Sequence, residues 1–254
     1  MERVLITGAR GRIATVLRPA LRVGVSELRL SDLTEPDDLV APETSFPADL
    51  ADFDAVCAAV DGMDAVVHLG AVADEAPLEQ IAGPNLHGTF HVFEACRRAG
   101  VGRVVFASST HATGMYPVGA PLDGTVAPRP DGIYGASKVW GEALGRMFAD
   151  RFGLSVVCLR IGLFGDRPGD QRELASWLSR ADGVRLVQAA LSADVEFAIV
   201  YGASANTRRW WPPDTEIGFV PLDDSEVFAD GLPESVYTVQ GGPNSTREHG
   251  GWAT

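Results

Sequence analysis

Cysteine is scarce in this 254-residue chain, and the three cysteines present, Cys57, Cys96 and Cys158, lie far apart in the sequence. The chain contains no Cys-x-x-Cys pair and no cluster of cysteine with histidine. Disulfide frameworks use paired cysteines in an oxidising compartment, and structural zinc sites use closely spaced ones. The sequence therefore favours a reduced, cytoplasmic protein with neither a disulfide framework nor a metal site.

Basic residues and long apolar runs are also in short supply. Lys and Arg number 21 against 34 Asp and Glu, so the formal net charge is −13. Nucleic acid is bound by clustered Lys and Arg, so this net charge argues against a nucleic-acid partner. No apolar run approaches the length needed to cross a bilayer, and the opening MERVLITG has the pattern of a strand, not of a signal peptide. We expect no membrane partner, whereas one placed arginine could still bind a small anion.

Short apolar runs alternate with helical patterns through the first two thirds of the chain. Apolar strands without polar alternation suit a parallel sheet that is buried on both faces, and their alternation with helices implies βαβ units. We predict one Rossmann-type, doubly wound α/β domain over residues 1–254, in which residues 163–254 form a small C-terminal cap. The strands are expected at 4–7, 27–33, 65–69, 103–108, 155–161 and 197–201, and the helices at 12–23, 52–60, 85–99, 132–152, 171–179 and 183–191.

A glycine-rich turn follows the first predicted strand, with Gly8, Gly11 and, in place of a third glycine, Ala14. Glycines at a strand-to-helix turn let the backbone approach a pyrophosphate, and the following helix N-terminus stabilises its charge. Asp32 comes a little over twenty residues later, at the end of the second strand. A carboxylate there accepts hydrogen bonds from the adenosine ribose and repels a 2′-phosphate, so the sequence favours NAD over NADP.

Two later segments could complete the cofactor site. Asp49 and Leu50 lie near the expected end of a third strand, where a side chain and a backbone N–H can contact adenine. Asp49 could equally be the N-cap of the following helix. Gly70 and Ala71 follow the strand at 65–69 and could form a backbone rim beside the central phosphates and ribose.

Tyr134 and Lys138 are the candidate reactive pair. Residues four apart lie on one face of a helix, so the lysine ammonium can lie beside the phenol. Its charge would favour the phenolate and lower the pKa of the tyrosine towards the working pH. Tyrosine then removes the proton of an alcohol while a hydride leaves for the nicotinamide.

Ser108 and Ser109 end a strand about twenty-five residues before Tyr134. We favour Ser109 as the hydroxyl that orients the reacting oxygen, because the last residue of a parallel strand points into the crevice where ligands bind. Either serine could instead cap the strand end. Asn85 could support Lys138, by holding a water or pinning backbone, or could be a helix N-cap.

With these residues the chain resembles the extended short-chain dehydrogenases of the NAD-dependent epimerase/dehydratase superfamily and, among them, the uronate dehydrogenase family. The resemblance covers most of the chain. The stretches that carry it are Thr7–Gly11, Val67–Gly70, Val105–His111, Pro128–Lys138, Arg160–Gly162, Asp170–Arg172, Tyr201–Asn206 and Gln240–Gly242.

The resemblance implies oxidation of a hexuronic acid, such as glucuronate or galacturonate, at C1 by NAD, with an aldarolactone as the first product and no metal. It gives Tyr134 as the base, Lys138 as its electrostatic partner and Ser109 as an orienting hydroxyl. The implied cofactor contacts are Gly8, Arg10, Gly11, Arg12, Ile13, Asp32, Leu33, Asp49, Leu50, Leu69, Gly70, Ala71, Ser108, Tyr134, Lys138 and Ile161. The implied substrate contacts are Ala73, Ser109, Thr110, His111, Tyr134 and Arg172, and the protein is expected to be a homo-oligomer.

Two of the implied substrate residues have other interpretations. The resemblance gives Arg172 the substrate carboxylate, for which a guanidinium fork has the right geometry, and it gives His111 the sugar. Without the resemblance, Arg172 is a polar residue at a helix start or on the surface. His111 could then be a loop residue packed against Tyr116 or Pro117.

Three positions depart from the family pattern. Thr110 replaces the usual Asn, Ala73 the usual Ser, and Leu163 another Ser. Each lost hydrogen bond to a buried sugar hydroxyl could cost about 1–3 kcal/mol of binding. The sugar could therefore differ from that of the family.

The alternative functions are dehydrogenation of another sugar or sugar acid, and a nucleotide-sugar epimerase or dehydratase. A nucleotide-sugar epimerase or dehydratase usually has a larger C-terminal domain than the roughly ninety residues that follow the strand predicted at 155–161. A catalytically silent NAD-binding regulator is the alternative from another class. A regulator would have no need for Tyr134, Lys138 and Ser109 together.

Overall fold

The computed structural model describes residues 1–213 and 216–246. Residues 214–215 and 247–254 of the predicted cap lie outside the described part. The described residues contain a seven-stranded parallel sheet in the order β3-β2-β1-β4-β5-β6-β9. Its strands are β1 (Arg3–Thr7), β2 (Glu27–Ser31), β3 (Glu43–Ser45), β4 (Ala65–His68), β5 (Arg103–Ser109), β6 (Ser155–Ile161) and β9 (Phe197–Gly202).

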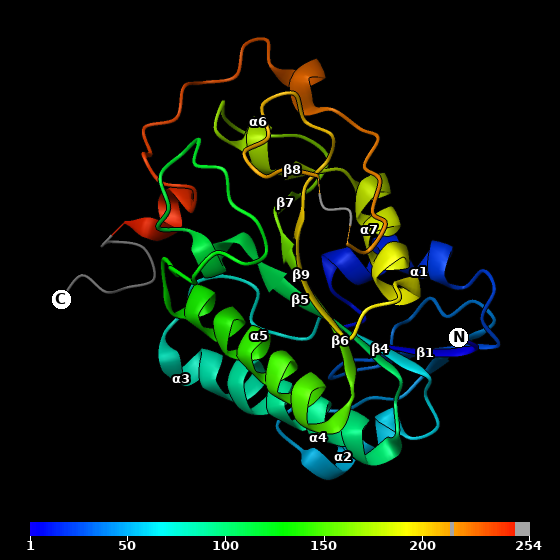
Figure 1. Ribbon diagram of the computed structural model, residues 1–254. Helices are drawn as coiled ribbons and strands as arrows, with labels where there is room; N and C mark the ends of the chain where they lie inside the picture. Colours follow the sequence, from blue (N-terminus) through cyan, green and yellow to red (C-terminus); the bar gives the residue numbers. More distant parts are fainter. Residues whose placement is uncertain (214–215, 247–254) are drawn as a thin grey trace.

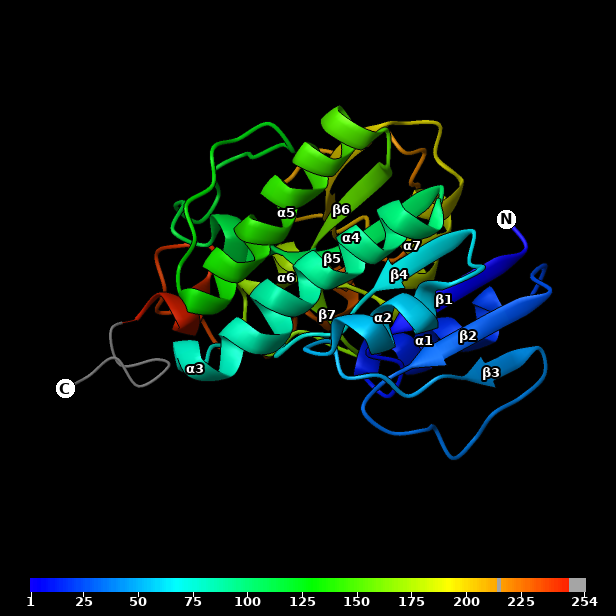
Figure 2. The same ribbon diagram turned by 90° about the horizontal axis from the view of Figure 1, so that it is seen from below.

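Helices cover both faces of the sheet (Figures 1 and 2). Neighbouring residues of a strand point to opposite faces, so Ile6 and Leu5 of β1 enter two different cores. One core is closed by α1 (Arg12–Leu21) and α7 (Arg180–Ser192), and the other by α2 (Phe53–Val60), α4 (Thr89–Ala99) and α5 (Ile133–Phe152). The doubly wound α/β fold predicted from the unbroken apolar strands is therefore confirmed.

The chain reverses its winding direction between β1 and β4, which are neighbours in the sheet. Ligands of open α/β sheets bind in the crevice beyond the carboxyl ends of the strands at such a switch point. The register aligns Thr7 with both Ser31 and His68, and Ser109 with Ile161. The strand ends that the motifs follow therefore meet at one edge of the sheet.

The helix predicted at 85–99 begins earlier and is irregular. It consists of α3 (Leu78–Ile81), a π-helical segment (Ala82–Gly88) and α4. Pro84 lies inside the π segment, and proline both lacks the N–H of a regular helix and clashes with the preceding turn. Wider π turns accommodate such a residue, and they occur often at functional sites.

The predicted helix at 171–179 was too long. Only α6 (Glu173–Ser176) is helical, and β8 (Trp177–Leu178) pairs in parallel with β7 (Leu163–Phe164). The extended backbone at Trp177 ends the helix. The Trp177 indole then donates to the Gly165 carbonyl, 2.9 Å away, which ties β8 to the residue that follows β7.

Residues 238–245, which we call the strap, return to the body of the protein and end in a 3₁₀ turn (Gly242–Ser245). The strap lies beside the loop that follows β5, as the red and green segments of Figure 1 show. Gly241 N donates to Gly114 O over 2.8 Å, and Gln240 N donates to Tyr116 O over 2.8 Å. These backbone bonds anchor the strap at the carboxyl edge of the sheet.

Candidate active site

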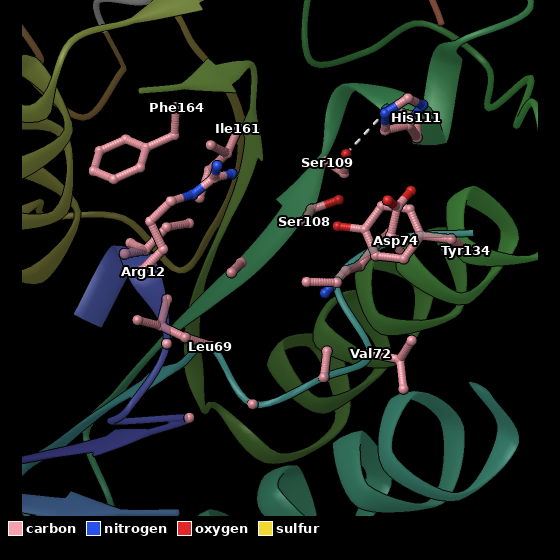
Figure 3. Close-up of a pocket in the computed structure, with 18 of the residues that line it drawn as sticks. Arg12, Leu69, Val72, Asp74, Ser108, Ser109, His111, Tyr134, Ile161 and Phe164 are labelled. Atoms are coloured by element: carbon pink, nitrogen blue, oxygen red, sulfur yellow. Dashed lines mark hydrogen bonds between the residues drawn. The ribbon is translucent and has the colours of Figure 1, made fainter. Parts of the chain in front are cut away.

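A cleft of about 800 Å³ runs along the carboxyl edge of the sheet, with residues from several elements pointing into it (Figure 3). The residues singled out from the sequence that line it are Gly8, Gly11, Arg12, Ile13, Asp32, Leu33, Asp49, Leu50, Leu69, Gly70, Ala71, Ala73, Ser108, Ser109, Thr110, His111, Tyr134, Lys138, Ile161, Leu163 and Arg172. The structure thus brings together residues that are up to 164 positions apart in the chain, from Gly8 to Arg172.

Arg10, which is predicted as a cofactor contact, is not among the described residues that line this cleft. Its guanidinium donates to Glu35 O over 2.6 Å and lies 3.7 Å from the Asp37 carboxylate. The exposed acidic loop after β2 therefore draws the side chain away from the cleft.

The turn between β1 and α1 brings backbone against the loop that follows β4. Gly8 has a φ of +68°, which favours glycine, and a Cβ there would lie only 2.7 Å from Gly70 N. Gly11 is the N-cap of α1 and offers no side chain to the first turn. The backbone N–H groups of that turn and the helix dipole suit a phosphate.

Asp32 follows β2 directly and lines the same end of the cleft. Its two carboxylate oxygens accept hydrogen bonds from Arg10 N and Leu33 N, over 2.9 and 2.8 Å. Each carboxylate oxygen retains a further lone pair, so the fixed group can also accept ribose hydroxyls. The glycine turn, the helix N-terminus and this acid together fit a dinucleotide.

Asp49 and Leu50 lie past the end of β3. Asp49 accepts a hydrogen bond from Ala51 N over 2.9 Å, but the N-cap of α2 is Asp52, which accepts from Ala55 N. The helix-cap interpretation of Asp49 was therefore wrong. Leu50 packs against Gly70. A Cβ built on Gly70 would lie 2.8 Å from the Cδ1 atom of Leu50.

Tyr134 and Lys138 occupy successive turns at the start of α5, and both side chains are buried. The ammonium nitrogen of Lys138 lies 5.4 Å from the centre of the Tyr134 ring and 5.2 Å from that of Phe106. The predicted i, i+4 placement of the pair is confirmed.

The electrostatics of the pair differ from our expectation. Burial raises the pKa of the Tyr134 phenol to about 12, while the hydrogen bond with Ser109 lowers it and the charges of Asp74 and Asp131 raise it further. Burial also lowers the pKa of Lys138 to about 8. Desolvation disfavours the charged form of each group, and it is the largest cause of both pKa shifts.

The two serines at the end of β5 have different surroundings. The Ser109 hydroxyl accepts from His111 N over 3.2 Å (Figure 3), and its hydrogen bonding to the Tyr134 phenol lowers the pKa of that phenol. The Ser108 hydroxyl donates to Glu142 over 2.6 Å. Ser109 is therefore the serine in direct contact with the reactive phenol.

Glu142 lies one turn after Lys138 on α5 and is buried with Arg160 of β6. The guanidinium makes two hydrogen bonds to the carboxylate, each 2.9 Å long. This bidentate pair ties α5 to the sheet directly behind the cleft.

Asn85 neither caps a helix nor contacts Lys138 in any hydrogen bond of the structure. Its buried side chain accepts from Val72 N and donates to Val72 O and to the Ser137 hydroxyl, over 2.8, 3.0 and 3.0 Å. It therefore pins the backbone of the loop after β4 to the first turns of α5, as one of the predicted alternatives proposed.

Glu75 was missed by the sequence analysis, although it holds the start of α5. Its two carboxylate oxygens accept from Ile133 N and Tyr134 N, over 2.8 and 2.9 Å. The N-cap residue of α5 is Gly132, which has no side chain for this task. A carboxylate 59 positions away in sequence therefore fixes the backbone of the reactive tyrosine.

His111 is oriented by Asp131. Its Nδ1 lies 2.7 Å from the Asp131 carboxylate, whose side chain is 1% exposed. The imidazole meets the Tyr134 ring edge-on, with ring centres 5.8 Å apart. A hydrogen bond to Nδ1 leaves Nε2 for a ligand. The interpretation of His111 as a loop residue packed on Tyr116 or Pro117 is not supported.

Arg172 also lines the cleft and is held by the strap. One terminal nitrogen donates to Gln240 O over 2.8 Å, and the other donates to Glu173 over 3.3 Å. The Nε atom is buried and has no hydrogen-bond partner in the structure, and the side chain is 9% exposed. A buried guanidinium with unused hydrogen-bonding capacity suits a carboxylate ligand.

The cleft is also lined by residues that the sequence analysis did not select. The position of Asp74 directly after Ala73 was a usable signal. Gln240 and Gly241 belong to a stretch that carries the resemblance, but their place in the cleft depends on the tertiary fold. These lining residues include Asp74, Pro84, Phe164, Glu173, Ser176, Gln240, Gly241, Pro243 and Asn244.

Within 1–213 and 216–246, no three His, Cys, Asp or Glu side chains are grouped as a metal would need. In the same residues, no helix is both long and apolar enough to cross a membrane.

Comparisons with known proteins give a consistent result. Residues 4–183 match the model of the NAD dependent epimerase/dehydratase family. The chain is 42% identical over 255 residues to uronate dehydrogenase of Pseudomonas syringae pv. tomato, covering 95% of this chain and 92% of that protein.

Solved structures agree with the sequence matches. One is uronate dehydrogenase from Agrobacterium tumefaciens, as a mutant complexed with NAD, with a TM-score of 0.90 and 39% identity over 96% of this chain and 97% of that one. Glucuronic acid dehydrogenase from Chromohalobacter salexigens gives a TM-score of 0.91 and 37% identity over 96% of each chain.

Proposed function

The chain belongs to the NAD-dependent epimerase/dehydratase family, and we propose that it oxidises a hexuronic acid, such as glucuronate or galacturonate, at C1 with NAD. The single observation that carries the proposal is the buried Arg172 guanidinium in the same cleft as Tyr134. A uronic acid presents a carboxylate at one end and an oxidisable hemiacetal hydroxyl at the other, so these two side chains match its two ends.

Residues of this chain would hold the dinucleotide along the switch point. The Gly8–Gly11 turn with the α1 N-terminus would hold the pyrophosphate, and Asp32 would hold the adenosine ribose. Bound NAD supplies the hydride acceptor and a positive charge. That charge would offset the burial that raises the pKa of Tyr134.

The proton chemistry belongs to Tyr134, Ser109 and Lys138. The ionised Tyr134 phenol accepts the proton of the C1 hydroxyl as hydride leaves C1, and the C1–O bond becomes a carbonyl. The ring oxygen stays bonded to C1, so the first product is an aldarolactone. Ser109, already hydrogen-bonded to the phenol, orients the reacting oxygen, and the Lys138 ammonium stabilises the phenolate.

His111 and the described cap residues complete the sugar site in this proposal. Asp131 fixes the imidazole of His111 so that Nε2 can contact a sugar hydroxyl. Residues 163–213 and 216–246 act as the substrate cap, an assignment supported by Phe164, Arg172 and Gln240 in the cleft wall.

A neutral aldose is the second candidate substrate. Ala73 and Leu163 line the cleft without a side-chain hydroxyl, where the family pattern has serines. Asp74, next to Ala73, instead brings a carboxylate to the wall, and carboxylates accept hydrogen bonds from sugar hydroxyls. This set could select a sugar that differs from the uronates.

A substrate panel tests the proposal. The purified protein is mixed with NAD and, separately, with glucuronate, galacturonate, glucose, galactose, arabinose and glucose 6-phosphate, and NADH absorbance is followed. We expect the highest kcat/KM with a uronate. Turnover of a neutral sugar without turnover of any uronate would replace the first candidate by the second.

The proposal also includes a reducing compartment, such as the cytoplasm, and a homo-oligomer. The first is supported by Cys57, Cys96 and Cys158, which are all free thiols. Fractionation of the source cells and the sedimentation of the purified protein measure these two properties.

A further inference from the structure

We propose that Gln240 is a positioning residue for substrate recognition: it fixes the strap so that the guanidinium of Arg172 is presented to the carboxylate of a sugar acid. This inference rests on the proposed function. It assigns to the strap a role in selecting acidic over neutral sugars.

The Gln240 side chain is a buried anchor between the strap and the core. Its amide nitrogen donates to Pro117 O and Ala120 O, over 3.2 and 2.9 Å. Its amide oxygen accepts from the Trp211 indole nitrogen over 3.0 Å, and the residue is only 5% exposed. A primary amide satisfies two carbonyls and one N–H at once, which neither a carboxylate nor an aliphatic side chain can do.

The backbone of Gln240 transmits this anchoring to Arg172. The carbonyl of Gln240 accepts from one terminal nitrogen of the guanidinium over 2.8 Å. A guanidinium is planar, so a bond at one nitrogen fixes the directions in which the remaining N–H groups point. The buried Nε, which lies 3.9 Å from the Asp170 carboxylate but has no hydrogen-bond partner among the described residues, is then held in a set orientation in the wall of the cleft.

Gly242 gives a second, independent contact between the strap and Arg172. A Cβ at this position would lie 2.7 Å from both Cζ and one terminal nitrogen of the guanidinium. The strap backbone therefore packs directly on the guanidinium group. Gly242 also has a φ of +61°, so its conformation and its contact both favour glycine.

The experiment compares Gln240→Leu and Gly242→Ala with the parent enzyme on the best uronate. We expect KM to rise by about tenfold or more while kcat changes by less than about threefold, because an interaction with the non-reacting end of the substrate is lost. The dissociation constant of NADH, measured by fluorescence, should stay the same. A strap that only stabilised the fold would leave KM unchanged.

Gly100→Ala is the matched control for backbone strain. Gly100 ends α4 with a φ of +70°, it is exposed, and no atom lies within 4 Å of a Cβ built there. This variant should lose stability as Gly242→Ala does and keep the parental KM. If Gln240→Leu does not fold, Gly242→Ala decides the KM result alone.

A double-mutant cycle tests whether Gln240 acts through Arg172. In an Arg172→Ala background, Gln240→Leu should change kcat/KM by less than about twofold, since the group it positions is gone. If the effects of Arg172→Ala and Gln240→Leu on kcat/KM multiply in the double variant, the inference is overturned. An unchanged KM in both Gln240→Leu and Gly242→Ala, measured with an active parent enzyme, would also overturn it. A parent enzyme that oxidises neutral sugars and no uronate would instead contradict the proposed function.

Discussion

Opposing influences act on one phenol at Tyr134. Burial raises its pKa to about 12, and the nearby carboxylates of Asp74 and Asp131 add to that effect. The Ser109 hydrogen bond works in the other direction. The local environment therefore keeps the Tyr134 phenol protonated when no cofactor is bound. In the proposed function, ionisation of the phenol requires the further positive charge that bound NAD would supply.

Replacing Tyr134 by phenylalanine removes the proposed base with little change of shape. We expect kcat to fall by about 10²–10⁴-fold, the usual contribution of general acid–base catalysis, while NADH binds as before. Steady-state kinetics and NADH fluorescence measure both quantities. Tyr116→Phe is the control, because the Tyr116 hydroxyl bonds to Ala127 O outside the cleft and its loss should leave kcat unchanged. Parental turnover in Tyr134→Phe would assign the base to another group.

Asp32 should decide between NAD and NADP. We expect Asp32→Ala to raise the ratio of kcat/KM for NADP to that for NAD by about tenfold or more, which corresponds to roughly 1.4 kcal/mol. Asp32→Asn is the matched variant, because its amide oxygen can still accept from Arg10 N or Leu33 N while the charge is lost. An unchanged ratio in both variants would show that another group excludes the 2′-phosphate.

His68 makes stability depend on pH. Burial and then the charge of Lys138 lower its pKa to about 3, whereas an unfolded histidine titrates near 6.5. Between these two values the unfolded chain binds a proton that the folded protein does not, so the free energy of unfolding falls as pH falls. The slope for one proton is about 1.4 kcal/mol per pH unit.

Urea unfolding between about pH 5 and 7 should therefore show a shallower pH dependence for His68→Asn than for the parent protein. Asparagine can keep the contact that His68 Nδ1 makes with the Thr7 hydroxyl, 2.7 Å away. The remaining histidines are the same in both proteins, so their contributions to the two slopes cancel. Equal slopes would mean that His68 takes up its proton in the folded state as well.

Helix α5 carries three functional turns in succession. Tyr134, Lys138 and Glu142 are spaced four residues apart, so they lie along one face of the helix. Glu142 ties the third turn to Arg160 of β6, and Glu75 ties the first turn to the loop after β4. The helix is thus fixed at both ends of the stretch from Tyr134 to Glu142, and this fixes the position of the phenol in the cleft wall.

Glu75→Ala removes the cap of α5. We expect a loss of about 0.5–2 kcal/mol in unfolding free energy, as for other helix caps, and in addition a fall in kcat because the backbone of Tyr134 is released. Asp52→Ala removes the corresponding cap of α2, away from Tyr134, and should cost similar stability without a change in kcat. Equal kcat losses in the two variants would show that Glu75 acts through stability alone.

Over the whole molecule, local sequence patterns predicted the residues that lie at strand ends or on one helix face. The apolar runs predicted the sheet, the glycine turn with Asp32 predicted one end of the cleft, and the Tyr134–Lys138 spacing predicted the reactive pair. Each of these signals acts over a short stretch of chain, where spacing alone determines which side chains are neighbours.

The parts that escaped prediction depend on contacts between distant segments. Glu75 reaches Tyr134 across 59 positions, and Gln240 reaches Arg172 across 68. Neither pair has a periodic pattern or a fixed spacing that could be read from the sequence. The raised pKa of Tyr134 was missed for a similar reason, since burial is a property of the assembled cleft.

The late position of the strap has a consequence for synthesis on the ribosome. The strands β1 to β9, whose ends hold the dinucleotide half of the cleft, are complete by Gly202, whereas the strap begins near Thr238. A nascent chain therefore contains the residues for the dinucleotide before it contains those that orient Arg172. In the proposed function, recognition of the sugar carboxylate is therefore the last property that the growing polypeptide acquires.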